Sequence, residues 1–180
     1  MKRIAFLLFL IITGCKIDDD KTIDRDKLTF KIGTDTQLFF KNVRQSYYDL
    51  EENKAAKFNV FRFSDRNVNQ EAWVLNLAIV VNYLQDEAYL LVEPSEAIGS
   101  ENIELRTQHP NKGDVKEVGL NEMNREGMLN FCTDVYELLV QGYQFEIKAG
   151  EEWKPIFDTH QAKEAFRITV SDYYRLTRVF

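Results

Sequence analysis

The spacing of apolar residues changes along this 180-residue chain, and the order of the patterns limits the folds open to it. Most apolar positions before residue 120 alternate with polar ones, which is typical of half-buried strands. Residues 121–141 and 158–176 place them three and four apart, as amphipathic helices do. This order predicts an α+β fold of two layers, in which a mainly antiparallel sheet of about five to seven strands carries two amphipathic helices on one face. A parallel, doubly wound sheet would need helices and strands to alternate.

β-branched and aromatic content with alternation predicts strands at 36–48, 58–64, 73–84, 88–93, 103–108 and 143–148, and an edge strand at 153–157 because Pro155 cannot donate. Residues 28–32 form a shorter strand-like patch, whereas 49–57 and 109–120 are expected to be connections. The apolar residues of 58–64 change face at Val60-Phe61, which indicates a bulge or burial on both sides. Segment 73–84 also has helical spacing, but its β-branched run favours the strand.

Two segments carry the helical pattern. Apolar side chains recur at Met128, Phe131, Cys132, Val135, Leu138 and Leu139 in the first, and at Ala162, Phe166, Val170, Tyr173, Tyr174 and Leu176 in the second. Asn121 is expected to cap the first helix, and Gly142 to end it. Asp158 or Thr159 is expected to cap the second.

The first fifteen residues have the anatomy of an export signal. Lys2 and Arg3 precede an apolar run of about nine residues, Ile4 to Ile12, which is too short to span a bilayer. The run ends in Ile12-Thr13-Gly14-Cys15, which resembles the lipobox of bacterial lipoproteins. The resemblance implies a signal peptide at 1–14, a lipidated (palmitate-bearing) Cys15 with an acidic tether at 15–33, and a single domain at 34–180.

An acidic cluster follows Cys15 directly. Lys16 to Lys21, with Asp18, Asp19 and Asp20 at its centre, resembles the surface-export signal of Bacteroidetes-type lipoproteins. The alternative is a solvated tether without a signal. The resemblance implies a lipid-anchored protein of the cell envelope, in the outer membrane of a Gram-negative bacterium, with the membrane as its first partner.

Charge and cysteine content narrow the classes of function. The formal charge of −6 becomes −8 when residues 1–14 are removed, because they contain Lys2, Arg3 and no acid. Such an acidic chain is a poor candidate for binding nucleic acid. With Cys15 lipidated, Cys132 is the remaining cysteine, so no disulfide is expected within the domain.

No motif specifies a reaction. Cys132 and His160 are a formal nucleophile–base pair, but Cys132 lies on the apolar stripe of its helix, where cysteine is an ordinary small hydrophobe. His109 and His160 lack zinc spacing, and the Asp18–Asp20 triplet lacks that of a calcium loop. No cofactor or metal is therefore predicted. Arg62, Arg66, Arg175 and Arg178 are expected to be surface or ion-pair groups.

Six aromatic residues are candidates for a ligand surface: Trp73, Trp153, Tyr47, Tyr48, Tyr173 and Tyr174. Tyr and Trp are favoured at interfaces, but they also pack in cores with a polar tip at the edge. These features favour a non-catalytic module that binds a protein or a glycan, for example an immunity-type lipoprotein. The alternatives are a structural subunit of an envelope complex and an envelope hydrolase.

Overall fold

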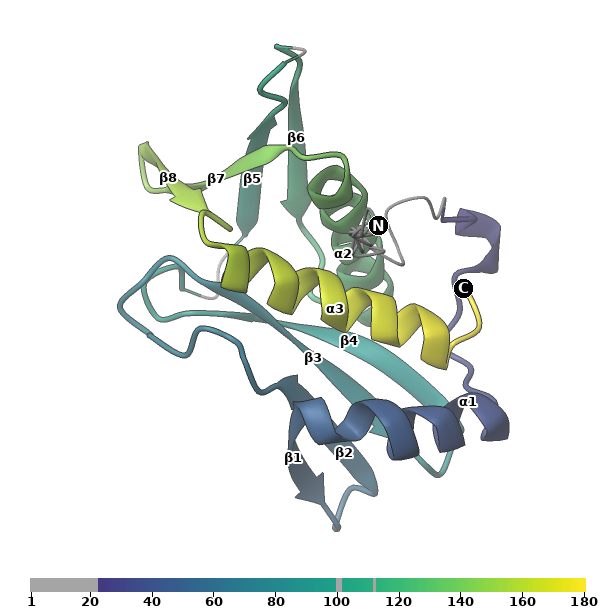
Figure 1. Cartoon of the computed structure of the whole chain (residues 1–180). Helices are drawn as coiled ribbons and strands as arrows, with labels where there is room; N and C mark the ends of the chain where they lie inside the picture. The colour runs from purple at the N-terminus through teal and green to yellow at the C-terminus, as the bar shows by residue number, and fades with distance from the viewer. Residues whose placement is uncertain (1–22, 100–101, 112) are drawn as a thin grey trace, which may run out of the picture.

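The computed structural model describes residues 23–99, 102–111 and 113–180 (Figure 1). The predicted leader, Cys15 and the Lys16–Asp20 cluster lie outside this part of the chain. The predicted α+β class is confirmed. Within the described residues there are two antiparallel sheets of four strands each and three α-helices, rather than one sheet of five to seven strands.

The first sheet, sheet A, is a simple meander. Its strands, in spatial order, are β1 (Tyr48–Asn53), β2 (Phe58–Phe63), β3 (Leu75–Asn82) and β4 (Glu87–Pro94). The strand predicted at 73–84 is confirmed, and so is the end of the next strand at Pro94. Pairing of β2 with both neighbours runs without interruption, so β2 has no bulge; Val60 and Phe61 are instead buried on opposite faces of the sheet.

The second sheet, sheet B, consists of two hairpins that pair side by side through their inner strands. Its spatial order is β6 (Val115–Leu120), β5 (Ile103–Gln108), β7 (Gln144–Ala149) and β8 (Glu152–Ile156). The edge position of β8 agrees with the prediction from Pro155, which lies opposite Glu146. The connection predicted at 109–120 is wrong in its second half, since β6 pairs with β5 along its whole length.

Both long helices are capped by side chains. Helix α2 (Arg125–Val140) begins after Asn124, whose side chain accepts a hydrogen bond of 2.7 Å from the Gly127 amide, so the expected cap at Asn121 is three residues too early. Gly142, at φ 83°, follows its end as predicted. Thr159 caps α3 (His160–Leu176) by accepting from the Ala162 amide at 3.1 Å.

The strand predicted at 36–48 is wrong, because this segment is helical almost throughout. It consists of α1 (Thr34–Phe39), a π-helical turn (Phe40–Arg44) and a 3₁₀ turn (Gln45–Tyr47). The Gly33 amide donates to Thr36 Oγ1 at 3.1 Å, and that hydroxyl donates to the Leu176 carbonyl at 2.7 Å, which holds the start of α1 against the end of α3. Residues 49–53, expected in a connection, form most of β1.

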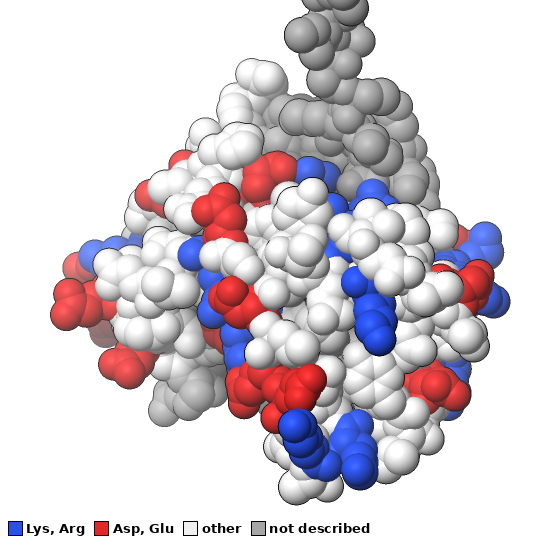
Figure 2. Space-filling view, turned by 60° about the horizontal axis from the view of Figure 1, so that its bottom comes forward, with Lys and Arg blue, Asp and Glu red and all other residues white. Residues whose placement is uncertain are grey.

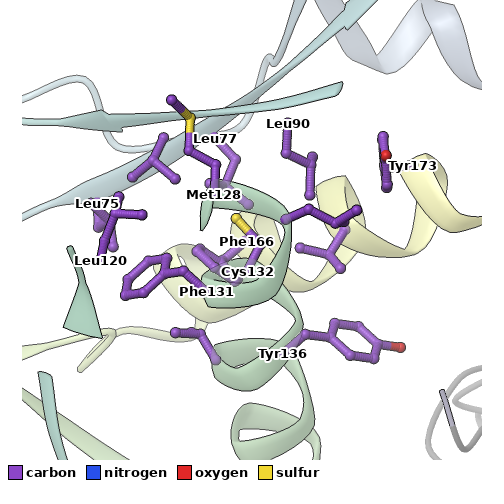
Figure 3. Packing of buried hydrophobic residues seen from close by; sticks show 14 of the residues in the cluster. Leu75, Leu77, Leu90, Leu120, Met128, Phe131, Cys132, Tyr136, Phe166 and Tyr173 are labelled. Atoms are coloured by element: carbon purple, nitrogen blue, oxygen red, sulfur yellow. The ribbon is translucent and has the colours of Figure 1, made fainter. Parts of the chain in front are cut away.

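One apolar core joins both sheets and both long helices. Figure 3 shows side chains from β3, β4, β6, α2 and α3 converging on the same space. Its labelled members include Leu77 and Leu90 from sheet A, Leu120 from sheet B, Phe131 and Cys132 from α2, and Phe166 and Tyr173 from α3. The start of the described chain belongs to this core too, since Ile23 is buried in it.

In the part of the chain that the structure describes, no helix has the length and apolar character needed to span a membrane.

Candidate functional site

The face of sheet A that points away from this core carries a second apolar cluster. Side chains alternate along each strand, so the neighbours of core residues Phe61, Ile79 and Leu90 point to the opposite face. That outer face buries Val60, Ala78 and Val80, with Phe58, Tyr89 and Leu91 packed around them half-buried. Figure 2, which turns the lower side of Figure 1 toward the viewer, shows uncharged side chains interspersed with acidic and basic ones.

A ladder of charges crosses the outer face beside this cluster. Arg62 Nε donates to both carboxylate oxygens of Glu93 at 2.9 Å, and Arg62 Nη1 donates to Glu51 Oε2 at 2.6 Å. The hydrogen bonds with Glu93, and then those with Glu51, raise the pKa of the Arg62 guanidinium against the effect of burial. Arg62 therefore stays charged, and from β2 it bonds a carboxylate on β1 and another on β4.

A second pair fixes the loop that follows β2. Arg66 Nη1 donates to Asp49 Oδ2 at 2.6 Å and to the Phe63 carbonyl at 2.9 Å, and Ser64 Oγ donates to Asp49 Oδ1 at 2.9 Å. The hydrogen bonds from Arg66 and then Ser64 hold the pKa of Asp49 below its usual range. The charged rim of the outer face is thus preformed.

A groove of about 720 Å³ lies next to this rim, within the range of small-molecule sites. Its walls are Arg62, Arg66, Asn76, Glu93 and the loops around Val68–Gln70 and Pro94–Gly99. Several of its polar groups are bonded within the protein: Asn76 Nδ2 donates to the Asn67 carbonyl at 2.7 Å, and Ser95 Oγ donates to the Ala72 carbonyl at 2.6 Å. The arginines of the groove are thus already paired, which suits recognition by shape better than capture of an ion.

Three of the six aromatic candidates are buried, so they do not lie on a ligand surface. Tyr48 Oη donates to Asp172, Tyr173 Oη to the Thr29 carbonyl at 2.8 Å, and Tyr174 Oη to Thr133 Oγ1 at 2.8 Å. Burial is the first cause that raises the pKa of all three phenols. Their hydroxyls are hydrogen-bonded within the protein, which is the core role that the sequence left open.

The other three candidates are accessible but lie in different places. Tyr47 is 52 % exposed at the end of the 3₁₀ turn, and the guanidinium of Arg44 lies 4.7 Å from its ring centre. Trp153 lies half-buried on the solvent face of sheet B beneath Arg106, at 4.6 Å. Trp73 lines a separate hollow of about 650 Å³. The structure therefore does not assemble the six into one surface.

The described residues form neither a nucleophile–base pair at Cys132 nor a metal site. Cys132 has no exposed surface, and burial raises the pKa of its thiol, which disfavours the reactive thiolate. His160 lies exposed at the start of α3, and the ring of His109 packs edge-on against Tyr143. No group of three or more His, Cys, Asp or Glu side chains in the described ranges could hold a metal ion.

A buried carboxylate that the sequence did not single out lies between α3 and the first helical segment. Asp172 is fully buried and accepts from Arg44 Nε at 2.9 Å with both oxygens, from Tyr48 Oη at 2.7 Å and from Arg175 Nη1 at 3.0 Å. Both oxygens are occupied by protein donors, so Asp172 acts as a structural clamp. The expectation that Arg62, Arg66, Arg175 and Arg178 form ion pairs is confirmed for all four.

No protein-family model matches the chain, and neither the curated proteins nor the solved structures contain a match to it. Burial on both faces of 58–64 was one of the two expected alternatives, but the outer face of sheet A was not singled out from the sequence as a candidate surface. Phe58 and Val60 in β2, and Tyr89 and Leu91 in β4, repeat apolar residues two apart on the face opposite Phe61 and Leu90.

Proposed function

We propose that the chain is a lipid-anchored protein of the bacterial cell envelope, in which the helices cover one face of sheet A and the other face binds a protein partner without catalysis. The observation that carries the binding role is the outer-face cluster: Phe58, Tyr89 and Leu91 stand half-buried around a buried aliphatic centre, with paired charges at the rim. Protein interfaces have this anatomy, an apolar centre inside a polar rim. The anchor is supported by the lipobox-like Ile12–Cys15.

The chemistry of the rim indicates what kind of partner fits. Around the face, Asp49, Glu51, Glu87, Glu93 and Glu96 stand against Arg62, Arg66, Lys31 and Arg125, so the rim keeps a small acidic excess. An acidic rim steers a basic partner toward the surface and disfavours acidic ones. The immunity-type role, in which the domain blocks a basic toxin, belongs to this proposal.

Capture from envelope fractions tests the binding role. A soluble Cys15→Ala form is compared with the same form carrying Tyr89→Glu and Leu91→Glu, which place charge in the centre of the face. We expect a reproducible partner that the double variant loses at least tenfold. Val115→Glu, which charges an equally apolar but remote and exposed position, should retain it. Equal capture by all three forms would contradict the assignment of this face.

The anchor is tested separately. Metabolic labelling with a clickable fatty acid should mark the full chain and not a Cys15→Ser variant. Protease treatment of whole cells then reports whether the domain faces outward, as expected if Lys16–Asp20 acts as a surface-export signal. Label retained by Cys15→Ser would overturn the anchor.

A further inference from the structure

Large apolar side chains are exposed along one edge of the molecule. Leu38 is 58 % exposed, Phe39 47 %, Val43 47 % and Leu84 73 %. The first three belong to the helical segment 34–47, and Leu84 belongs to the β3–β4 turn. That turn is fixed beside the start of α1, because the Ile32 amide donates to the Asp86 carbonyl at 3.0 Å and Lys31 Nζ donates to the Gln85 carbonyl at 3.2 Å. These four side chains are here called the apolar edge.

Packing inside the protein does not account for the apolar edge. The buried side chain of the same helical segment is Phe40, which contacts Tyr48 and Phe61 in the core. Phe39 and Val43, four residues apart, share a side of the segment that faces solvent, with exposed Lys41 between them in sequence. Exposed aromatic and aliphatic side chains with a neighbouring lysine are characteristic of helices that lie at a membrane surface.

The distance to the proposed anchor limits which side of the domain can meet a bilayer. The chain is fixed to the domain from residue 23, since Ile23 is buried and Arg25 Nη2 bonds Asp134 at 2.9 Å and Glu137 at 2.5 Å on α2. Cys15 is eight residues earlier, and eight extended residues reach at most about 28 Å. A domain of this size has a diameter of roughly 40 Å. A lipid on Cys15 would therefore hold only the side near Ile23 against the membrane.

The segment that carries most of the apolar edge begins on that side. Figure 1 shows the first described residues, the C-terminus and the start of α1 along the same flank of the molecule. The Thr36 hydroxyl bonds the Leu176 carbonyl, and Arg178 pairs with Asp35, so the start of α1 is fixed beside the chain end.

We propose that the apolar edge inserts into the headgroup region of the bilayer that carries the Cys15 lipid, which fixes the orientation of the domain on the membrane. The inference rests on the lipid anchor of the proposed function. The bilayer that the apolar edge enters has zwitterionic headgroups, because anionic headgroups would repel the acidic chain. Four side chains suffice for this membrane contact, because the short tether at Cys15 holds the domain near the bilayer and makes the contact effectively intramolecular.

The test supplies the anchor chemically. The chain beginning at Cys15 is coupled through a maleimide to a lipid in phosphatidylcholine nanodiscs; Cys132 has no exposed surface and does not compete. With methyl-labelled leucine and valine, a spin label on the lipid acyl chains should broaden the signals of Leu38, Val43 and Leu84 severalfold. Val68 and Val115, exposed by 63 % and 56 % elsewhere on the molecule, are internal controls and should keep their intensity.

A double variant, Phe39→Glu with Val43→Glu, should restore the Leu38 and Leu84 signals while the remaining spectrum stays unchanged. Equal intensities at the apolar edge and at the two control valines would overturn the proposal. So would broadening that depends on the protein-to-lipid ratio, which would indicate a second copy on this edge. Because the anchor is supplied chemically, a failure of fatty-acid labelling in cells overturns the anchor and not this contact.

Discussion

Asp172 is a buried carboxylate that connects separate segments of the domain. Its carboxylate joins Arg44 from the π-helical turn, Tyr48 from the start of β1 and Arg175 from α3. A buried charge is tolerated only when its partners replace water on every side. These hydrogen bonds therefore hold the helical segment 34–47 against α3. Removing the Asp172 carboxylate would take away an acceptor that Arg44 and Arg175 share.

Replacing Asp172 by alanine should lower the free energy of unfolding by about 3 kcal/mol, near the lower end for a broken buried pair. The lower end applies because Arg44 and Arg175 keep 22 % and 27 % of their side-chain surface and can find water. Urea unfolding measures the change. Asp134→Ala is the matched control: it removes an aspartate whose arginine partner is itself 43 % exposed, so it should cost less than about 1 kcal/mol. Equal losses would contradict the clamp.

For single residues, the sequence predicts which kind of contact a side chain makes but not which residue is its partner. The four arginines are recognisable as ion-pair groups from their polar surroundings, but Glu93 lies 31 residues from Arg62 and Asp172 lies 128 residues from Arg44. Such pairs are chosen by the fold. Tyr48, Tyr173 and Tyr174 look the same in sequence whether a ring faces ligand or core, and only the location of Asp172, Thr29 and Thr133 decides.

Among the elements, the helical segment 34–47 departs most from its local sequence. Its aromatic and β-branched content favours a strand, but strand preference is mostly a preference for a half-buried pleated surface and changes with context. The segment finds its burial through one residue, Phe40, whose ring lies 5.2 Å from that of Phe61. Tertiary packing of that ring, with the Gly33–Thr36 bonds at its start, outweighs the composition.

Two adjacent phenylalanines test this account of the segment. Phe40→Ala should lower the free energy of unfolding by about 3–4 kcal/mol, as expected for a large aromatic removed from a core. Phe39→Ala, one residue earlier and 47 % exposed, should change it by less than about 1 kcal/mol in solution. Paired urea titrations of the two variants give both values. Similar losses would place Phe39 in the core and contradict the described helix.

The missed strand β6 has a different cause. It is an edge strand, and Val115, Lys116 and Glu117 at its start are exposed, so its first half has no alternation to detect. Gly119 also reads as a breaker. Only Val118 and Leu120 face the core. The strands predicted correctly, such as β7, alternate cleanly because one whole face of each is buried.

Over the whole molecule, the sensitivity to alkali follows from four buried acidic groups. Burial raises the pKa of Tyr48, Tyr173, Tyr174 and the Cys132 thiol in the folded chain. The unfolded chain ionises near pH 10 at tyrosine and about 8.5 at cysteine. A group whose folded pKa is raised contributes its full stability below the unfolded pKa and loses it as pH rises above that value.

We therefore expect the free energy of unfolding to be flat below about pH 8, as far as these groups contribute, and to fall above pH 10 by about 1.4 kcal/mol per pH unit for each ionising group. Urea midpoints between pH 7 and 11 measure the fall. Tyr173→Phe should make it shallower by one proton, whereas Phe39→Ala, which removes an exposed side chain without a titratable group, should leave the slope unchanged. A slope independent of both variants would contradict the assignment.

The number of sheets could not be predicted from the sequence, because strand pairing depends on contacts between distant segments. Local pattern places strands and helices along the chain, and it placed most of them correctly here. It does not say that β5 pairs with β7 across the intervening α2 rather than with β4, which is nearer in sequence. That choice is made by the shared core, where Leu105 and Ile147 of sheet B join residues of sheet A.

The two ends of the described chain lie on one flank, and this has a practical consequence for anyone who manipulates the protein. A fluorescent reporter or affinity tag fused after Phe180 would start on this flank, where the Phe180 ring packs against Tyr136 of α2 and Tyr174 of α3. On a lipid-tethered molecule such a fusion would be wedged between domain and bilayer. It would oppose the membrane pose proposed above, so localisation and capture experiments are best performed without a fusion at this position.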